Sequence, residues 1–378
     1  MINHRGPEFA SLIAALTRAL QDVLKTQGDV LLLTASGSGG MEAAVANTLA
    51  RNDKVLLFVN GAFGERFHSI CRAYGVDARR VDVPWGRAVE PDLVRDELAK
   101  EKGKDGAKAV LLQHGETSTG VLNPLKEIAE VVRDAGKLLI VDSVSAAGAV
   151  ELEVDQWGID VLVTASQKAW GAPPGVAIVT MSPRAWKAYD RSDLPKAYFD
   201  LQQAKASLEK AQTPTTPAVS VFIALQESLK LMAEEGIDAI VRRHRDLAYA
   251  TRRGVQAVGL PLFADEAHAS PCVTSFRPPT RVDSRNLIRI LRESYDTIVA
   301  GGQGRLEGQI VRVGHMGFVT VPDVVSFFSA LEFTLRDLHQ AVEPGQGIAA
   351  FLRAYDEATQ PPPKIGRTAP KTATLARR

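Results

Sequence analysis

Short apolar runs alternate with amphipathic segments along the chain from about residue 29 onwards. Runs such as DVLLLT at 29–34, KVLLFV at 54–59 and LLIVDS at 138–143 have the length and the Val, Ile and Leu content of buried strands. The segments between them show helical periodicity, and Gly75 stands where one such helix would end. Strands that are apolar on both sides need helices on both faces. The pattern therefore predicts an α/β fold with a mainly parallel sheet, whose ligands bind at the carboxyl ends of the strands.

The pattern changes after about residue 195. A proline-punctuated loop, TPTTPAVS, precedes two long helical patterns at 219–235 and 237–258. A few strands and helices then alternate up to residue 339, which predicts a smaller α+β domain. The expected parts are an N-terminal segment (1–20), a large domain (21–255), a small domain (256–345) and a C-terminal extension (346–378). The end of that extension is basic and proline-rich, so we expect it to be disordered.

Charge and cysteine content narrow the possible functions. Lys and Arg total 45 against 44 Asp and Glu, which gives no reason to expect nucleic acid or an anionic membrane as the main partner. Cys71 and Cys272 form no Cys-x-x-Cys pair, and the seven histidines show no paired ligand spacing. We therefore predict no disulfide framework and no metal site. The start MINHRGPEFA lacks the apolar core of a secretory signal and no run is long enough to span a membrane, so we expect a soluble, cytoplasmic protein.

One lysine stands in an unusual place. Lys168 follows an apolar strand and precedes a Gly-Ala-Pro-Pro-Gly turn. Such a lysine either reaches solvent from the strand end or, when its amine is kept partly neutral, attacks a carbonyl. Asp142 ends another strand and is either a helix cap or a functional group at the ligand-binding edge. Together the two supply the pair that pyridoxal phosphate requires, an amine for the Schiff base and a carboxylate that keeps the pyridine nitrogen protonated.

A candidate phosphate-binding loop lies between a predicted strand and a predicted helix. The stretch TASGSGGMEA offers backbone N–H groups at a helix N-terminus, where an anion can bind. It is not a dinucleotide fingerprint, because Glu42 stands where the third glycine should be, and no Gly-Lys-Ser/Thr follows as in a Walker loop. Taken alone, it is equally consistent with a flexible turn.

A family resemblance joins these features. The chain contains, in this order, the motifs SGSGGMEAA, NGAFGERF, HGETSTGVLNPL, VDSVSAAGA, WGIDVLVTASQKAWGAPPG and GQIVRVG. Together they resemble the class V aminotransferases, which are fold-type I pyridoxal phosphate enzymes, and in particular the alanine–glyoxylate and serine–glyoxylate/pyruvate group. The resemblance covers roughly residues 3 to 340. It implies pyridoxal 5'-phosphate as cofactor and a large domain with a mainly parallel seven-stranded sheet.

The resemblance also implies roles for single residues. Lys168 and Asp142 would be the catalytic pair, and Arg312 would bind the substrate carboxylate. Phe63 would stack on the cofactor ring, and Thr117 would lie near its phenolic oxygen. Thr215 would reach the phosphate of the neighbouring subunit's cofactor, which implies a homodimer with shared active sites. The cofactor-binding positions implied in this way are Ser36, Gly37, Ser38, Phe63, Thr117, Asp142, Gln167, Lys168 and Thr215.

Three functions remain open at this point. The preferred one is a transaminase that moves an amino group from alanine or serine to glyoxylate or pyruvate. A cysteine desulfurase or lyase of the same family would need a reactive cysteine on a mobile loop, and Cys272 is more consistent with a buried position. The third is a non-catalytic scaffold subunit. The family's Gly-Pro-rich segment ahead of NHRGPEF contributes to the substrate entrance, and this chain starts with MINHRGPEF, so we expect that part of the entrance to be missing. We also expect His114 and Glu116 to stabilise the turn around Thr117, and His315 to line the substrate entrance.

Overall fold

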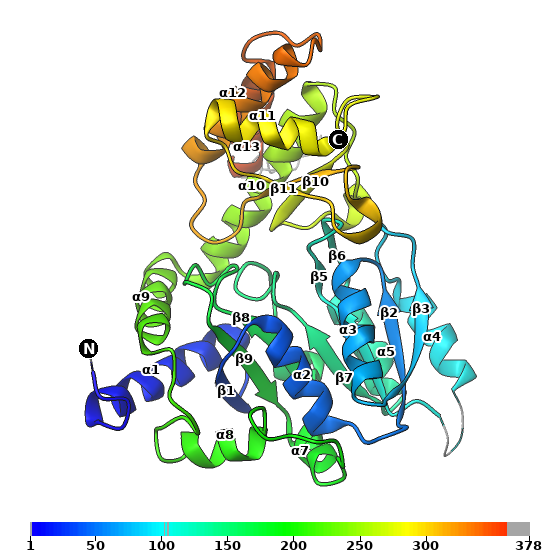
Figure 1. The fold of residues 1–378 in the computed structure, drawn as a ribbon, viewed down its shortest axis with the longest axis vertical. Coiled ribbons are helices and arrows are strands. Elements are labelled where there is room, and N and C mark those ends of the chain that lie inside the picture. The colour runs from blue at the N-terminus through cyan, green and yellow to red at the C-terminus, as the bar shows by residue number, and fades with distance from the viewer. Residues whose placement is uncertain (1, 102, 104–105, 361–378) are drawn as a thin grey trace, which may run out of the picture.

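The computed structural model describes residues 2–101, 103 and 106–360, and its larger part is built on a seven-stranded sheet (Figure 1). The strand order is β1-β9-β8-β7-β4-β2-β3. Only the two pairings made by β9 are antiparallel, which confirms the expected α/β class and the mainly parallel sheet. The strands are β1 (Asp29–Thr34), β2 (Lys54–Val59), β3 (Asp77–Asp82), β4 (Ala109–Gln113), β7 (Leu138–Asp142), β8 (Val161–Ala165) and β9 (Val176–Met181).

Helices cover both faces of this sheet, and each face has its own apolar core. The first core includes buried residues of α1 (Pro7–Leu24), α4 (Pro91–Lys100), α5 (Leu125–Asp134), α6 (Val154–Trp157) and α9 (Val219–Glu235). The second includes those of α2 (Gly37–Thr48), α3 (Ala62–Ala73), α7 (Pro183–Tyr189) and α8 (Leu201–Leu208). Burial on both sides explains why the strands read as nearly continuous apolar runs.

The smaller part contains a three-stranded antiparallel sheet and a third core. The sheet has the order β10-β12-β11, from β10 (Val273–Phe276), β11 (Ala300–Gly301) and β12 (Val311–Gly314). Its helices are α10 (Ile237–Ala257), α11 (Ser284–Tyr295), α12 (Val321–Asp337) and α13 (Gln346–Thr359). Residues expected as the start of a C-terminal extension thus form α13, which packs against α10 and α12. The predicted disordered end, 361–378, lies outside the described residues.

The smaller part sits over the carboxyl ends of the parallel strands (Figure 1). Several hydrogen bonds join it to the segment around the hairpin of β5 (Gly115–Glu116) and β6 (Val121–Leu122). Ser275 Oγ donates to the Thr119 carbonyl at 2.6 Å, and the Ser270 N–H donates to the Gly120 carbonyl at 2.8 Å. This junction is where an α/β sheet binds its ligand. None of the helices in the described ranges is long and apolar enough to cross a membrane.

Candidate active site

Asp142 and Lys168 come from neighbouring parallel strands at this edge. Asp142 is the last residue of β7 and is paired in register with Val163 of β8, five residues before Lys168. The turn that carries Lys168 is held rigidly: the buried Trp170 donates its indole N–H to Thr164 Oγ1 at 2.8 Å, and Ser166 Oγ donates to the Pro173 carbonyl at 2.7 Å. These hydrogen bonds therefore fix the backbone position from which the Lys168 side chain extends.

The environment of the two groups favours their neutral forms. Burial raises the pKa of the Asp142 carboxyl to about 6, although one backbone hydrogen bond and the positive charges of Arg66 and Lys168 oppose this shift. Burial, followed by the positive charge of Arg312, lowers the pKa of the Lys168 amine, and the charge of Asp142 opposes it. The amine and the carboxyl group thus lie within electrostatic reach of each other. An amine of lowered pKa is the form that attacks a carbonyl.

Asp142 is 4% exposed yet poorly hydrogen-bonded. Its Oδ1 accepts the Val144 N–H at 3.0 Å, and within the described residues Oδ2 accepts no hydrogen bond. A buried carboxylate normally has several donors. The free oxygen can therefore receive a donor from a ligand, as a pyridinium N–H would provide.

The N-terminus of α2 presents unpaired backbone N–H groups near this pair. The first N–H of α2 to find an acceptor in the described chain is that of Gly40, which donates to the Ser36 carbonyl at 3.2 Å, so the preceding N–H groups remain free. A Cβ atom at Gly37 would lie 2.6 Å from Val144 Cγ2, so only glycine allows this close approach. Gln167 Oε1 is buried without a hydrogen-bond partner. Free N–H groups and the helix dipole fit a phosphate group, whereas the unpaired Gln167 oxygen needs a donor.

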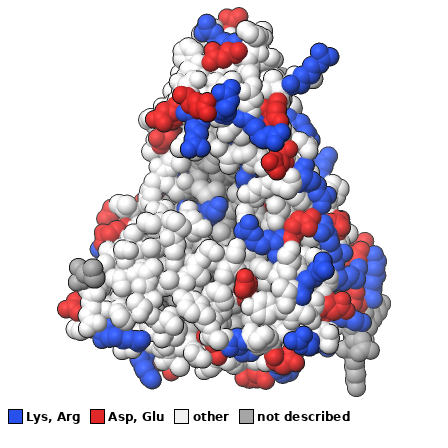
Figure 2. Space-filling model, viewed as in Figure 1, with Lys and Arg blue, Asp and Glu red and all other residues white. Residues whose placement is uncertain are grey.

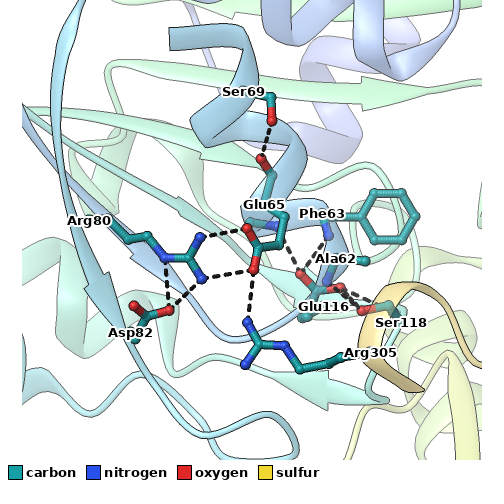
Figure 3. A network of polar contacts seen from close by, with 10 residues as sticks. Ala62, Phe63, Glu65, Ser69, Arg80, Asp82, Glu116, Ser118 and Arg305 are labelled. Atoms are coloured by element: carbon teal, nitrogen blue, oxygen red, sulfur yellow. Dashed lines mark hydrogen bonds and ion pairs between the residues drawn. The ribbon is translucent and has the colours of Figure 1, made fainter. Parts of the chain in front are cut away.

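Glu116 holds the beginning of α3, the helix that carries Phe63 (Figure 3). Its fully buried carboxyl group accepts the N–H groups of Phe63 and Gly64, both at 3.1 Å, through Oε2. Oε1 accepts Ser118 Oγ at 2.6 Å. Burial raises the pKa of Glu116 to about 7 against these hydrogen bonds. Glu116 is thus more than a turn former: it is the cap of α3 and fixes the backbone of the predicted stacking residue.

Another carboxylate, that of Glu65 on α3, connects this helix to the smaller part (Figure 3). Glu65 pairs with Arg80 at 2.6 Å and with Arg305 at 2.9 Å. Arg305 belongs to a short helical turn, η2 (Gly304–Leu306), and its guanidinium lies 4.4 Å from the centroid of Trp85. The helix of Phe63 and the sheet of Arg312 are therefore held in one arrangement.

Arg312 projects from β12 into the junction and is 7% exposed. Its Nε donates to the Gly301 carbonyl at 2.8 Å and its Nη1 to the Thr117 carbonyl at 2.9 Å. No described residue accepts a hydrogen bond from Nη2, and no carboxylate forms an ion pair with this arginine there. A buried guanidinium without a counter-ion is the group that a substrate carboxylate can satisfy.

The structure brings most of the predicted site residues to this junction and leaves others apart. Asp142, Lys168, Arg312, Phe63 and Thr117 surround it through the contacts above. Ser36, Gly37, Ser38 and Gln167 lie at its anion-binding end. Thr215 is exposed on the loop ahead of α9, and its expected contact with a second subunit's cofactor stays a prediction.

His315 is the residue that sequence reasoning misplaced. It is fully buried, with Nε2 2.9 Å from Thr274 Oγ1 and Nδ1 2.9 Å from the Pro271 carbonyl oxygen. It therefore belongs to the packing of the small part and does not line an entrance. Arg66 was missed altogether. Its spacing of three residues from Phe63 on a predicted helix was the signal that could have found it.

Cys272 is buried, and burial raises the pKa of its thiol to about 12. A thiol of that kind does not supply the reactive thiolate that desulfuration needs. Within the described ranges, no three His, Cys, Asp or Glu side chains come together in a way that could hold a metal ion.

Comparisons with known proteins agree with this geometry. A family model described as aminotransferase class-V matches residues 1–319. The chain is 43% identical to an uncharacterized aminotransferase of Methanocaldococcus jannaschii, over 89% of this chain and 88% of that protein. It is 42% identical to a protein of Synechococcus sp. named soluble hydrogenase, small subunit, over 94% and 93%. It is 34% identical to the L-aspartate–glyoxylate aminotransferase of Paracoccus denitrificans, over 95% and 91%.

Solved structures resemble this chain over nearly its whole length. The pyridoxamine–pyruvate aminotransferase of Mesorhizobium loti matches with a TM-score of 0.88 and 29% identity, over 94% of this chain and 91% of that one. An alanine–glyoxylate aminotransferase of Nostoc sp. matches with a TM-score of 0.84 and 31% identity, over 89% of each chain.

Proposed function

This chain belongs to the class V aminotransferase family, and we propose that it moves an amino group from alanine or serine to glyoxylate or pyruvate. It is an aminotransferase, and its cofactor is pyridoxal 5'-phosphate. The observation that carries the proposed chemistry is that the charges of Asp142 and Arg312 both act on the Lys168 amine, which follows β8 at the carboxyl edge of the sheet.

The roles proposed for the two groups follow from their environments. Bound pyridoxal phosphate supplies an aldehyde and a ring that accepts electrons. Lys168 presents an amine of lowered pKa, suited to covalent attachment of the cofactor and then to moving a proton at the substrate's α-carbon. The free Oδ2 of Asp142 would accept the pyridinium N–H and keep that nitrogen protonated.

Three further groups would position the cofactor. Phe63 would stack on its ring, with the backbone of Phe63 held by Glu116. Thr117 is 8% exposed and would lie near the phenolic oxygen. The first turn of α2, from Ser36 to Ser38, together with the side-chain N–H groups of Gln167, would receive the phosphate.

Arg312 would select the substrate. Amino and 2-oxo acids share an α-carboxylate, and the unpaired Nη2 of this buried arginine can donate to it. Glyoxylate is favoured as the acceptor because it appears in the names of the Paracoccus and Nostoc relatives, whose donors differ from each other. The names of these relatives therefore do not identify the amino donor, which the assay below tests.

We further propose a homodimer with shared active sites. Figure 2 shows few charged side chains on the face below a hollow that contains a basic side chain. Two of the large apolar side chains that are exposed are Tyr198 and Phe318. Tyr198 donates its hydroxyl to the Thr34 carbonyl at the end of β1, and Phe318 lies against Gly171, in the turn after Lys168. Such a patch is typical of an interface. Thr215 would then reach the partner's cofactor phosphate. Light scattering should give twice the chain mass of 40.7 kDa, and a fully active monomer would contradict the shared site.

A donor and acceptor panel tests the proposed reaction. Alanine, serine and aspartate would each be assayed with glyoxylate and with pyruvate, following both the new amino acid and the new 2-oxo acid. We expect the highest kcat/KM with alanine or serine and glyoxylate. Release of sulfide from cysteine without transamination would favour a desulfurase instead. Cofactor binding with no turnover on any pair would favour the scaffold subunit. A cytoplasmic location stays a prediction.

A further inference from the structure

Arg66 connects the two helices that begin at the cofactor site. It stands three residues after Phe63 on α3, and its guanidinium carbon lies 4.9 Å from the centroid of the Phe63 ring. Its Nη1 donates to Ser38 Oγ, in the first turn of α2, at 3.1 Å. The guanidinium therefore lies between the predicted stacking residue and the predicted phosphate loop.

Arg66 has no anionic partner in the described part of the chain. Its side chain is exposed and forms no ion pair there, whereas its neighbour Glu65 holds two arginines. The charge of Arg66 also reaches the site, because it opposes the rise in the pKa of Asp142 and helps to lower the pKa of Lys168. It adds this charge to the free N–H groups of α2, so the anion-binding end carries two positive features and no negative side chain that pairs with them.

We propose that Arg66 is a cofactor-binding residue that neutralises part of the charge of the cofactor phosphate while it packs on Phe63. The inference rests on the cofactor and site assigned above and adds a residue to them. A phosphate monoester carries close to two negative charges at neutral pH, and a helix N-terminus supplies only about half a positive charge. Arg66 supplies a full positive charge and donors that suit phosphate oxygens.

A second role for Arg66 would be to bind the distal carboxylate of a dicarboxylic donor such as aspartate. The hydrogen bond to Ser38 favours the phosphate, because Ser38 belongs to the anion-binding first turn of α2. Arg312 already serves the carboxylate end of the junction, on a different element. The two roles separate in an experiment that removes the phosphate but leaves the ring.

The test compares pyridoxal phosphate with pyridoxal on the apoprotein, with Kd measured from the absorbance of the bound cofactor. In Arg66→Gln, we expect pyridoxal phosphate to bind about 10- to 100-fold more weakly, because a charged hydrogen bond is lost, while the Kd of pyridoxal stays unchanged. Arg66→Lys should recover part of the affinity. The matched control is Arg72→Gln, which removes an exposed arginine from the other end of α3 and should change neither Kd.

Two outcomes would overturn the proposal. Equal weakening of both ligands would show that Arg66 only supports the fold around Phe63. Unchanged cofactor binding with a raised KM for aspartate would assign Arg66 to the substrate. If the unmodified protein bound neither ligand, the cofactor assignment itself would fail. A second measurement needs no variant: added salt should weaken binding of pyridoxal phosphate more than that of pyridoxal.

Discussion

Two buried aspartates stand at opposite ends of two neighbouring parallel strands, β7 and β8, and their surroundings differ. Asp160 directly precedes β8 and is 2% exposed. Its carboxyl group accepts the Leu139 N–H at 3.0 Å and Ser182 Oγ at 2.8 Å, and Arg184 lies 3.7 Å away. Asp142, at the carboxyl end of β7, has a single backbone donor.

The difference shows at which end of the sheet buried polar atoms lack hydrogen-bond partners within the chain. Burying a carboxyl group costs free energy that hydrogen bonds must offset. At the amino end the fold supplies those bonds, so Asp160 belongs to the scaffold. At the carboxyl end Asp142, Gln167 and Arg312 each keep polar atoms without a described partner. A bound ligand is what would complete them.

The largest effect is expected for Lys168→Ala. Loss of the amine removes the covalent attachment and the proton carrier, so kcat should fall by about 10²–10⁴-fold or more. Lys205→Ala is the matched control, because Lys205 pairs with Asp29 at 2.8 Å at the other end of the sheet. Steady-state kinetics check both variants. Near-normal turnover in Lys168→Ala would sink the assignment of this residue.

Asp142→Asn should be the next largest. An amide cannot hold the pyridinium proton as a carboxylate does, so we expect kcat to fall about 10²–10³-fold. The free energy of unfolding of the apoprotein at pH 7 should stay the same or rise, because a poorly bonded buried charge disappears. Chemical denaturation, measured beside the kinetics, checks both parts. A large loss of stability with unchanged kcat would place Asp142 with the scaffold.

Arg312→Ala should act on the substrate and spare the cofactor. Removing the guanidinium takes away charged hydrogen bonds to the substrate carboxylate, so kcat/KM should fall about 100-fold. The Kd of pyridoxal phosphate should change less than about threefold. Titration of the apoprotein separates the two quantities. Equal losses in both would mean that Arg312 mainly holds the junction together through Thr117.

Asp160→Asn should show the opposite behaviour to Asp142→Asn. The amide leaves at least one buried donor unsatisfied, so the free energy of unfolding should fall by about 1–3 kcal/mol. Activity per folded molecule should remain close to that of the unmodified enzyme. Denaturant unfolding and an active-site titration measure the two effects. If Asp160→Asn were stable but inactive, Asp160 would act in catalysis, and the contrast between the amino and carboxyl ends of the strands would be wrong.

The smallest expected effect is a pH dependence of apoprotein stability. Folding raises the pKa of Asp142 from 3.8 to about 6 and that of Glu116 from 4.5 to about 7. The folded state therefore holds these protons more tightly, so their contribution is present at low pH and is lost as pH rises through these ranges. Asp142→Asn should remove about 1–3 kcal/mol of that decline between pH 4 and 6. An unchanged pH profile in the variant would contradict the raised pKa.

Much of the fold could be predicted because it depends on local pattern. The strands at 29–34 and 54–59 and the helix at 219–235 lie where their apolar periodicity indicated. The antiparallel direction of β9 could not be predicted, since a buried strand looks the same in either direction. Helix α13 was missed because its apolar stripe makes sense only against α10 and α12.

The site divides in the same way. Lys168 and Asp142 stood out because a charged group after an apolar strand is unusual. Glu116 could not be assigned from the sequence as the cap of α3, because that contact joins segments 52 and 53 residues apart. Arg66 and Ser38 are 28 residues apart and meet only because α2 and α3 begin at the same edge.

The central claim is that the Lys168 amine and the Asp142 carboxyl group share one cofactor site. Its most direct test is to load the protein with pyridoxal phosphate, reduce it with borohydride and locate the added mass by peptide sequencing. We predict that the label lies on Lys168, at one per chain, and that it is lost or much reduced in Asp142→Asn. A label on another lysine, or no label at all, would contradict it.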